Sequence, residues 1–239
     1  LSSKWRKRIR INDRKVVEID YSGIHIVMLY ALKNIDYWSK INTDPYNIKG
    51  LEQSERMRDL LKVVLLSSIN AENRTKTKQA IQFEINMDKD LYQWSLSKKL
   101  DLNDILDKFV STHAPIKEYF FSGKGIVLQN ADSRIAEMVV NHCTRHHIPM
   151  LCIHDSFVIE QKHKQLLQDV MNKSFEVVLK EFLTTGSIAT SKLKIEEYNQ
   201  PKQESVRRVL TIGNAKPISQ DVINQLNQIT REKRTVIWK

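Results

Sequence analysis

The chain has 239 residues, of which 41% are hydrophobic, so it can bury a sizeable core as one domain or as two closely packed lobes. Lysine and arginine outnumber aspartate and glutamate by 38 to 28, and the resulting formal net charge of +10 favours a polyanionic partner. Nucleic acid fits this charge, as would contact with a ribosome or a membrane surface. No apolar run approaches the roughly 18 residues that span a bilayer, and no secretory leader opens the chain. We therefore expect a cytoplasmic protein, in the host cytoplasm if a virus or mobile element encodes it, without a membrane partner.

The N-terminal part of the chain predicts a basic leader, a strand and a helix. Residues 1–15 carry seven lysines and arginines around Trp5, a composition that suits either a phosphate backbone or solvent. The apolar residues of 16–20 predict a strand that ends in an aspartate. Apolar side chains near helical spacing predict a helix over 23–34, and a loop follows at 42–50.

The next part of the chain predicts helices only. From 51 to 73, apolar residues repeat at spacings of three and four, which leaves Arg58 and Lys62 one turn apart on the same face. The stretch 76–120 predicts two or three further helices, one of them capped by Asp101. A helical insertion with two cations on one face is therefore expected here.

The C-terminal half predicts helices and strands in alternation, after a Gly-Lys-Gly break at 123–125. The predicted elements are helices over 131–145 and 162–183, a hairpin over 150–159, a strand over 191–198, and a short helix near 218–229 in a basic tail. The amphipathic pattern of 162–183 predicts that this helix packs on the sheet. The whole pattern predicts an α+β fold in which helices back a small antiparallel sheet.

Two aspartates stand out because each follows a run of apolar strand residues. Asp20 ends the strand 16–20, and Asp155 lies in the turn of the hairpin 150–159. A carboxylate that follows buried strand residues is fixed by the sheet and projects at its edge, where two such groups can share a pair of Mg²⁺ ions. The sequence therefore predicts that these two side chains converge on Mg²⁺, for which Mn²⁺ could substitute.

Four short motifs, taken in order, resemble the catalytic motifs of family A DNA polymerases and single-subunit RNA polymerases. They are Asp20-Tyr21-Ser22 with His25, Arg58 with Lys62, Leu128-Gln129, and His154-Asp155-Ser156. The resemblance implies a polymerase palm with helical fingers and no exonuclease domain. The implied parts are a basic leader (1–15), the palm in two pieces (16–50 and 126–198), the fingers (51–125) and a basic C-terminal extension (199–239).

The resemblance implies template-dependent addition of nucleotides to a primer 3′ end, as in a DNA polymerase that uses DNA primer-template and nucleoside triphosphates. The catalytic carboxylates Asp20 and Asp155, with the backbone carbonyl of Tyr21, would hold two Mg²⁺ ions. Arg58 and Lys62 would bind the incoming triphosphate, because long cations can neutralise oxygens that the metals do not reach.

Two further positions would contact the primer-template. Gln129 would touch the minor groove at the nascent pair, where a side-chain amide can donate to purine N3 or pyrimidine O2, which every base pair presents. His154 would lie near the primer 3′ end. The glutamine contact would test the shape of the base pair without reading its sequence.

The remaining nucleotide-binding positions depart from the family pattern. His25 stands where DNA polymerases of this family usually have a Glu that closes off the space for a ribose 2′ hydroxyl, so the choice of sugar stays open. Leu66 and Asn70 replace aromatic side chains of the fingers helix, which removes stacking surface beside the nucleotide and the template base.

The fingers are expected to be small, because only 155 − 20 = 135 residues separate the two carboxylates. A weak grip on primer-template is expected, with an accessory protein or a further N-terminal region supplying the rest.

Two other functions remain open from the sequence. One is an RNA polymerase or primase of the same superfamily, with DNA or RNA as the template. The other is a non-catalytic nucleic-acid-binding module with a degenerate polymerase fold. Three histidines, His142, His146 and His147, include an i,i+4 pair that could bind zinc, but no fourth ligand is obvious.

Overall fold

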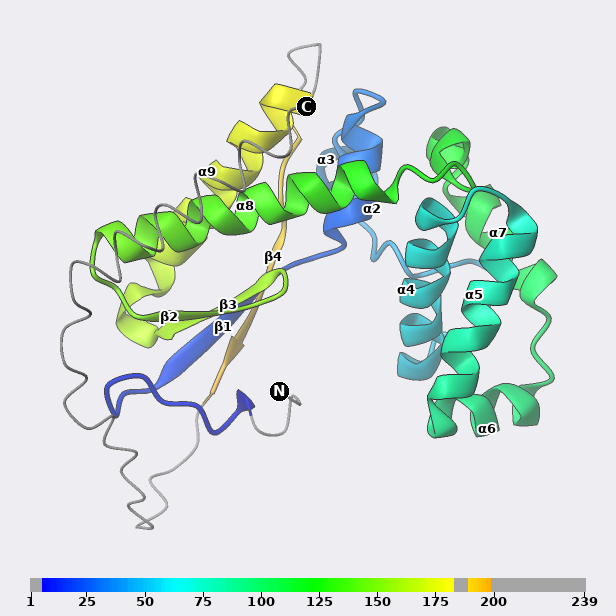
Figure 1. Cartoon of the computed structure of the whole chain (residues 1–239), viewed down its shortest axis with the longest axis horizontal. Helices are drawn as coiled ribbons and strands as arrows, with labels where there is room; N and C mark the ends of the chain where they lie inside the picture. Colours follow the sequence, from blue (N-terminus) through cyan, green and yellow to red (C-terminus); the bar gives the residue numbers. More distant parts are fainter. Residues whose placement is uncertain (1–5, 183–188, 199–239) are drawn as a thin grey trace, which may run out of the picture. The chain divides into compact units, whose positions relative to one another are not determined.

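A computed structural model describes residues 6–182 and 189–198 of the chain. The predicted helix near 218–229 and the basic extension 199–239 lie outside these residues. Within them, no helix is both long and apolar enough to cross a bilayer. The described part combines helices with one small antiparallel sheet, which is the predicted α+β class (Figure 1).

The sheet has four antiparallel strands in the order β2-β3-β1-β4. The strands are β1 (Val16–Tyr21), β2 (Met150–Ile153), β3 (Ser156–Glu160) and β4 (Leu193–Glu197). The strands predicted over 16–20, 150–159 and 191–198 are therefore confirmed. The prediction that both aspartates follow buried strand residues is wrong for β2, where Leu151 is 44% exposed. The reason is that β2 is an edge strand with a single neighbour.

Alternation along the strands gives the sheet two different faces. Ile19, Tyr21 and Phe157 belong to the main core, which is formed with α8 (Gly125–Arg145) and α9 (Lys164–Phe182). The predicted packing of the 162–183 helix on the sheet is confirmed, because α9 contacts β1 and β3. Val16 and Val158 form a separate cluster with Tyr198, Ile9 and Ile11 on the other face. The N-terminal segment thus covers part of the face that carries Asp20.

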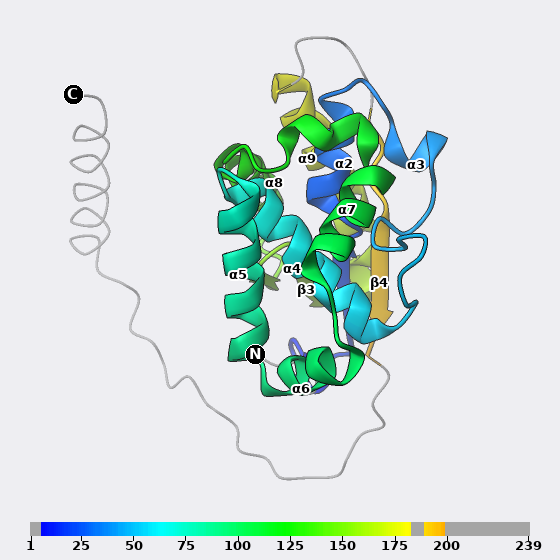
Figure 2. The same ribbon diagram turned by 90° about the vertical axis from the view of Figure 1, so that its right-hand side faces the viewer.

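Helices fill the chain between β1 and α8, and those from α4 onward lie in the range 51–125 that was expected to be a helical insertion (Figures 1 and 2). They are α2 (Ile24–Ala31), α3 (Tyr37–Lys40), α4 (Glu55–Asn70), α5 (Arg74–Met87), α6 (Lys89–Lys98), α7 (Leu102–Thr112) and the 3₁₀ helix η1 (Ala114–Tyr119). The side chains of Ser54, Asn73, Asp88 and Asp101 cap four of these helices by accepting hydrogen bonds from their first backbone N–H groups. The predicted cap at Asp101 is confirmed.

Helix α8 begins earlier than the sequence predicted. The Gly-Lys-Gly segment was expected to be a break ahead of a short apolar run, with the helix starting only at 131, but one continuous helix runs from Gly125. Gly125 is needed for close packing, since a Cβ there would lie 1.8 Å from Asn70 Oδ1 and 3.3 Å from Asn70 Cα. The glycine therefore lets the start of α8 approach the end of α4, instead of ending a helix.

A buried histidine holds the loop after α3 against the helices. His113 Nε2 donates to the carbonyl of Pro45 at 2.9 Å, and Tyr30 lies with its hydroxyl 3.2 Å from His113 Nδ1. His113 is 2% exposed, so these contacts satisfy both ring nitrogens away from water. The anchored loop carries Asp44 and Tyr46, which line the pocket described next.

Candidate active site

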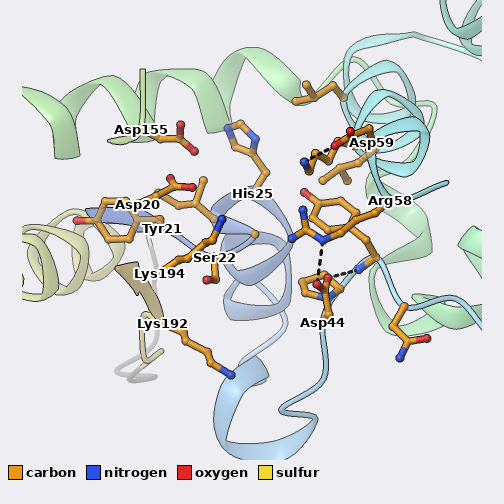
Figure 3. Close-up of a pocket in the computed structure, with 18 of the residues that line it drawn as sticks. Asp20, Tyr21, Ser22, His25, Asp44, Arg58, Asp59, Asp155, Lys192 and Lys194 are labelled. Carbon is orange, nitrogen blue, oxygen red and sulfur yellow. Dashed lines mark hydrogen bonds and ion pairs between the residues drawn. The ribbon is translucent and has the colours of Figure 1, made fainter. Parts of the chain in front are cut away.

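The pairing of β1 with β3 brings the two predicted carboxylates together. Asp20 lies opposite Ser156 in the ladder, so the preceding residue, Asp155, extends from the hairpin turn just past the end of β1. The turn between β2 and β3 contains only His154 and Asp155, and His154 adopts a left-handed backbone conformation with φ of +55°. Figure 3 shows Asp20 and Asp155 on the same side of one pocket.

Asp20 is placed where its negative charge is unfavourable. Burial, followed by the negative charge of Asp155, raises the pKa of Asp20 from 3.8 to about 7, although Lys194 acts in the opposite direction. Its Oδ1 atom is buried, and no group among the described residues forms a hydrogen bond with it. A bound cation would compensate both the repulsion and the unmatched oxygen.

The backbone of Tyr21 adds a third oxygen to this part of the site. Ser22 N–H donates to the carbonyl of Lys192, so the backbone groups of Ser22 point toward β4. Since successive residues of a strand alternate in direction, the carbonyl of Tyr21 points the other way, toward the side on which Asp155 lies. The Tyr21 side chain is used structurally, because its hydroxyl donates to the carbonyl of Met171 at 2.7 Å.

These groups fit Mg²⁺ better than a transition metal. The described residues hold no cluster of three or more His, Cys, Asp or Glu side chains suited to a metal ion. Two carboxylates and a carbonyl are hard oxygen ligands, and Mg²⁺ in nucleotide-binding sites usually takes one or two carboxylates, with water and substrate phosphates completing its shell. Asp20, Asp155 and the Tyr21 carbonyl would therefore supply the protein's share of the ligands.

The pocket has a volume of about 1180 Å³ and is lined by the two aspartates at the sheet edge and by the helical insertion. Arg58 and Lys62 of α4 line it, as do Leu66 and His25. Four of the five predicted nucleotide-binding residues thus share a pocket with the two carboxylates. The fifth, Asn70, lies at the end of α4 and is exposed.

Arg58 and Lys62 are each paired with a carboxylate in this structure. Arg58 Nε lies 3.0 Å from Asp44 Oδ2, and its guanidinium lies 5.0 Å from the centre of the Tyr46 ring. Lys62 Nζ lies 2.6 Å from Asp59 Oδ1. The side chains of these pairs are 42–57% exposed, and ion pairs at such exposure contribute little, so a phosphate group could replace the carboxylates.

Of the two predicted primer-template residues, the pocket contains one. His154 lines it beside Asp155. Gln129 does not line it; its amide is exposed and lies 3.4 Å from Asn70 Oδ1, as a donor to that oxygen. The neighbouring Ile126 is 70% exposed, so the start of α8 presents an amide and an apolar side chain to solvent.

Several pocket residues were missed by the sequence analysis. Asp132 of α8 lies with Oδ2 3.7 Å from His25 Nε2, and both side chains line the pocket. Burial raises the pKa of Asp132 and lowers the pKa of His25. An uninterrupted helix through 125–145 would have placed Asp132 on the same face as Gln129, three residues earlier. Lys194 could not be found this way, because its position opposite Asp20 depends on the pairing of β4 with β1.

The basic leader is partly built into the fold. Arg6 forms an ion pair with Glu18, which is 6% exposed and also accepts hydrogen bonds from Tyr198 and, at 2.8 Å, from the hydroxyl of Ser156. In this structure Arg6 therefore pairs with a buried carboxylate, which leaves it unavailable to a phosphate backbone. The alternative of a solvated leader does not hold for this residue either.

Comparison with known proteins finds similarity to solved structures only. No protein family matches the chain, and no curated protein does. Among solved structures, the chain is similar to the POL domain of Pol1 from M. smegmatis, in complex with DNA primer-template and dNTP, with a TM-score of 0.40 and 8% sequence identity. The similarity covers 82% of this chain but only 42% of that chain.

Proposed function

We propose that this chain is a template-dependent nucleotidyltransferase that extends a primer 3′ end, as the sequence resemblance to polymerases implies. The observation that supports it most is the pairing of β1 with β3, which sets Asp20 beside Asp155 in a pocket that Arg58 and Lys62 also line, with Arg58 across from the two aspartates in Figure 3. Carboxylates facing cations across one pocket suit a substrate that has both a metal-bound reacting phosphate and a negatively charged leaving group.

The protein's own groups would act by binding and orienting the reactants. Arg58 and Lys62 would exchange their present carboxylate partners for the phosphates of the incoming nucleotide, which fixes the triphosphate along α4. Asp20, Asp155 and the carbonyl of Tyr21 would hold Mg²⁺. When bound, Mg²⁺ lowers the pKa of a hydroxyl nucleophile and neutralises phosphate charge. No covalent intermediate with the protein is required.

Four side chains would hold the primer-template next to these groups. Gln129 would donate to the minor groove of the newly formed pair, with Asn70 as its support. His154, fixed in the tight turn beside Asp155, would lie against the end of the primer. The exposed apolar side chains of Leu66 and Ile126 would cover the base pair in the absence of an aromatic residue on α4.

Primer extension tests this proposal directly. Wild-type protein is offered a primer on a DNA or RNA template, with ribonucleotides or deoxyribonucleotides and Mg²⁺ or Mn²⁺, and is compared with Asp20→Ala and Asp155→Ala. We expect extension by the wild type and a loss of at least about 1000-fold in each variant, because each removes a metal ligand. Asp169→Ala, which removes an exposed carboxylate of α9, is the matched control and should keep full activity.

The competing function, a binding module without catalysis, gives a different result. Fluorescence anisotropy measures binding of the same primer-template by all four proteins. Binding by every protein, with synthesis by none under any combination of nucleotide, template and metal, would contradict the proposed enzyme. A metal readout independent of activity is the rise in melting temperature with Mg²⁺, which the two pocket variants should lose.

A further inference from the structure

A network of buried side chains lies next to the two carboxylates but outside the pocket. Its centre is Glu18 of β1, which is 6% exposed and accepts hydrogen bonds from Arg6, Tyr198 and, at 2.8 Å, the hydroxyl of Ser156. Arg6 belongs to the N-terminal segment, Ser156 begins β3, and Tyr198 follows β4. These four residues do not line the pocket, so they have no role in the function proposed so far.

Ser156 is the point at which this network reaches the turn that carries Asp155. It follows Asp155 directly and pairs with Asp20 across the ladder. Its hydroxyl lies 2.8 Å from a carboxylate oxygen of Glu18 and 3.1 Å from the carbonyl oxygen of Ile153, the last residue of β2. Because a hydroxyl has a single proton and a charged acceptor makes the stronger bond, Ser156 donates to Glu18. Glu18 therefore holds the first residue after the turn.

The turn between β2 and β3 lies at an exposed edge of the sheet. It consists of His154 and Asp155, and His154 has a φ of +55°, a left-handed conformation that is unfavourable for a residue other than glycine. On its outer side lies the edge strand β2, whose Leu151 is 44% exposed. On that side the turn receives a weak thiol hydrogen bond, from Cys152 Sγ to the carbonyl of His154 at 3.4 Å. The bond from Ser156 to a buried carboxylate is stronger, so it contributes more to the position of the turn.

Arg6 and Tyr198 determine where the carboxylate of Glu18 lies. Arg6 and Ser156 donate to its Oε1 atom, and Tyr198 donates to Oε2. A buried carboxylate that loses its cation must take up a proton or move toward water, and either change weakens its charge-assisted bond to Ser156. The removal of the Arg6 guanidinium would therefore loosen the turn from a distance.

The same network also fastens the N-terminal segment and the end of β4 to the sheet. Apolar side chains could do this equally well, because replacing a buried ion pair by packed apolar groups is often neutral or stabilising. A charged acceptor has a further effect that apolar groups lack, since it gives Ser156 a strong bond directed away from the turn. The two roles can therefore be separated by experiment.

We propose that Glu18 positions the metal site: its carboxylate fixes Ser156 and thereby keeps Asp155 within reach of a metal ion bound between the two aspartates. Glu18 lies outside the pocket and acts only through Ser156. The inference rests on the proposed function, because it takes Asp20 and Asp155 as Mg²⁺ ligands. Through Arg6, it also makes the N-terminal segment part of the support of the metal site.

Binding of Mn²⁺, followed by the electron paramagnetic resonance of the free ion, tests this inference without catalysis. Ser156→Ala removes the hydroxyl and leaves Glu18 its other two partners, so the fold should keep most of its stability. We expect its dissociation constant for Mn²⁺ to rise by about 10- to 100-fold, the usual effect of removing a group that orients a metal ligand. Ser174→Ala, which removes the same hydroxyl from a buried serine of α9, is the matched control and should bind Mn²⁺ as the wild type does.

A charge-neutral double variant separates positioning from a purely structural role. Arg6→Met combined with Glu18→Leu replaces the ion pair by apolar side chains and leaves the net charge unchanged. We expect a melting temperature close to that of the wild type, together with a Mn²⁺ dissociation constant raised by about 10- to 100-fold. Wild-type affinity in this variant or in Ser156→Ala overturns the inference. If the double variant melts early, the result for Ser156→Ala decides.

Primer extension keeps a failure of this inference distinct from a failure of the proposed function. We expect Ser156→Ala to need about 10- to 100-fold more Mg²⁺ for its half-maximal rate and to approach the wild-type rate at saturating Mg²⁺. Synthesis with an unchanged Mg²⁺ requirement overturns the positioning role and leaves nucleotidyl transfer standing. Weakened Mn²⁺ binding without synthesis by any protein contradicts nucleotidyl transfer and supports the positioning role. Absence of both Mn²⁺ binding and synthesis in the wild type overturns the two together.

Discussion

Replacement of Asp20 by asparagine should stabilise the metal-free protein while removing its response to Mg²⁺. Burial and the charge of Asp155 raise the pKa of Asp20 from 3.8 to about 7. Since one pKa unit corresponds to about 1.4 kcal/mol, the ionised carboxylate costs the folded state about 4 kcal/mol relative to the unfolded chain. Asparagine removes this charge and its cost. Its amide is still a buried polar group, however, and burying it costs about 1–3 kcal/mol. A net stabilisation of about 2 kcal/mol at pH 8 is expected.

The sign of the pH dependence follows from a folded-state pKa that lies above the unfolded value. Near pH 4 the carboxyl is protonated in the folded protein, so wild type and Asp20→Asn should be about equally stable. As the pH rises from about 4 to 7, the unfolded chain ionises while the folded protein still holds the proton, and the wild type loses stability. The difference between the two proteins should therefore grow over this range and level off above pH 7.

Thermal unfolding at pH 5 and pH 8, with and without Mg²⁺, measures these effects. At about 2–4 °C per kcal/mol for a protein of this size, Asp20→Asn should melt about 4–8 °C above the wild type at pH 8 without metal. Mg²⁺ at 100 times its dissociation constant should stabilise the wild type by about 2.7 kcal/mol and leave the variant unchanged. Asp169→Asn, on the exposed side of α9, makes the same charge change and should stay within about 0.5 kcal/mol of the wild type. A variant that melts below the wild type at pH 8, or one that Mg²⁺ stabilises equally, would refute the reasoning.

Three further predictions concern the scaffold around the pocket, each measured by urea unfolding. Gly125→Ala would place a Cβ 1.8 Å from Asn70 Oδ1 and 3.3 Å from Asn70 Cα, so the Asn70 side chain must rotate away and the two backbones must shift slightly, at a cost of about 1–3 kcal/mol; unchanged stability would contradict their close packing. Arg6→Ala leaves the buried carboxylate of Glu18 without its cation and should cost about 3–5 kcal/mol, most of which Glu18→Gln should restore in the double variant. Phe109→Ala empties a fully buried position of α7 and should cost about 3–5 kcal/mol; a cost below about 1 kcal/mol would show that the helical insertion contributes little to the core.

The strands and the two aspartates could be predicted because their signals are local. Each signal spans only a few residues: one apolar run ends in Asp20, and a second is interrupted by His154-Asp155. The two-residue turn then fixes which groups lie at the edge of the sheet. The start of α8 could not be predicted, because Gly125 serves a contact with Asn70 that is 55 residues away in sequence, since 125 − 70 = 55. A glycine chosen for close packing looks the same in sequence as a glycine that ends an element.

The same limit explains why part of the pocket was missed. Asp132 gains its position from the crossing of α8 with α2, and Lys194 from the pairing of β4 with β1. Both contacts join residues more than 100 positions apart, since 132 − 25 = 107 and 194 − 20 = 174. A motif search finds only residues that the family pattern already contains. Asp132 and Lys194 are not part of that pattern, so their place in the pocket can be recognised only from the fold.

The proposed cation site at Asp20 is best supported by a comparison with Glu18, on the same face of β1. Glu18 and Asp20 are two residues apart and both are largely buried, so each would have to lose its charge or find a partner. The fold gives Glu18 three partners, namely Arg6, Ser156 and Tyr198. Near Asp20 it places a second carboxylate, Asp155, whose repulsion Lys194 offsets only in part, and no described group forms a hydrogen bond with Asp20 Oδ1. The sheet thus neutralises one buried acid and leaves the next with a net repulsion, which a cation bound at the proposed Mg²⁺ site would offset.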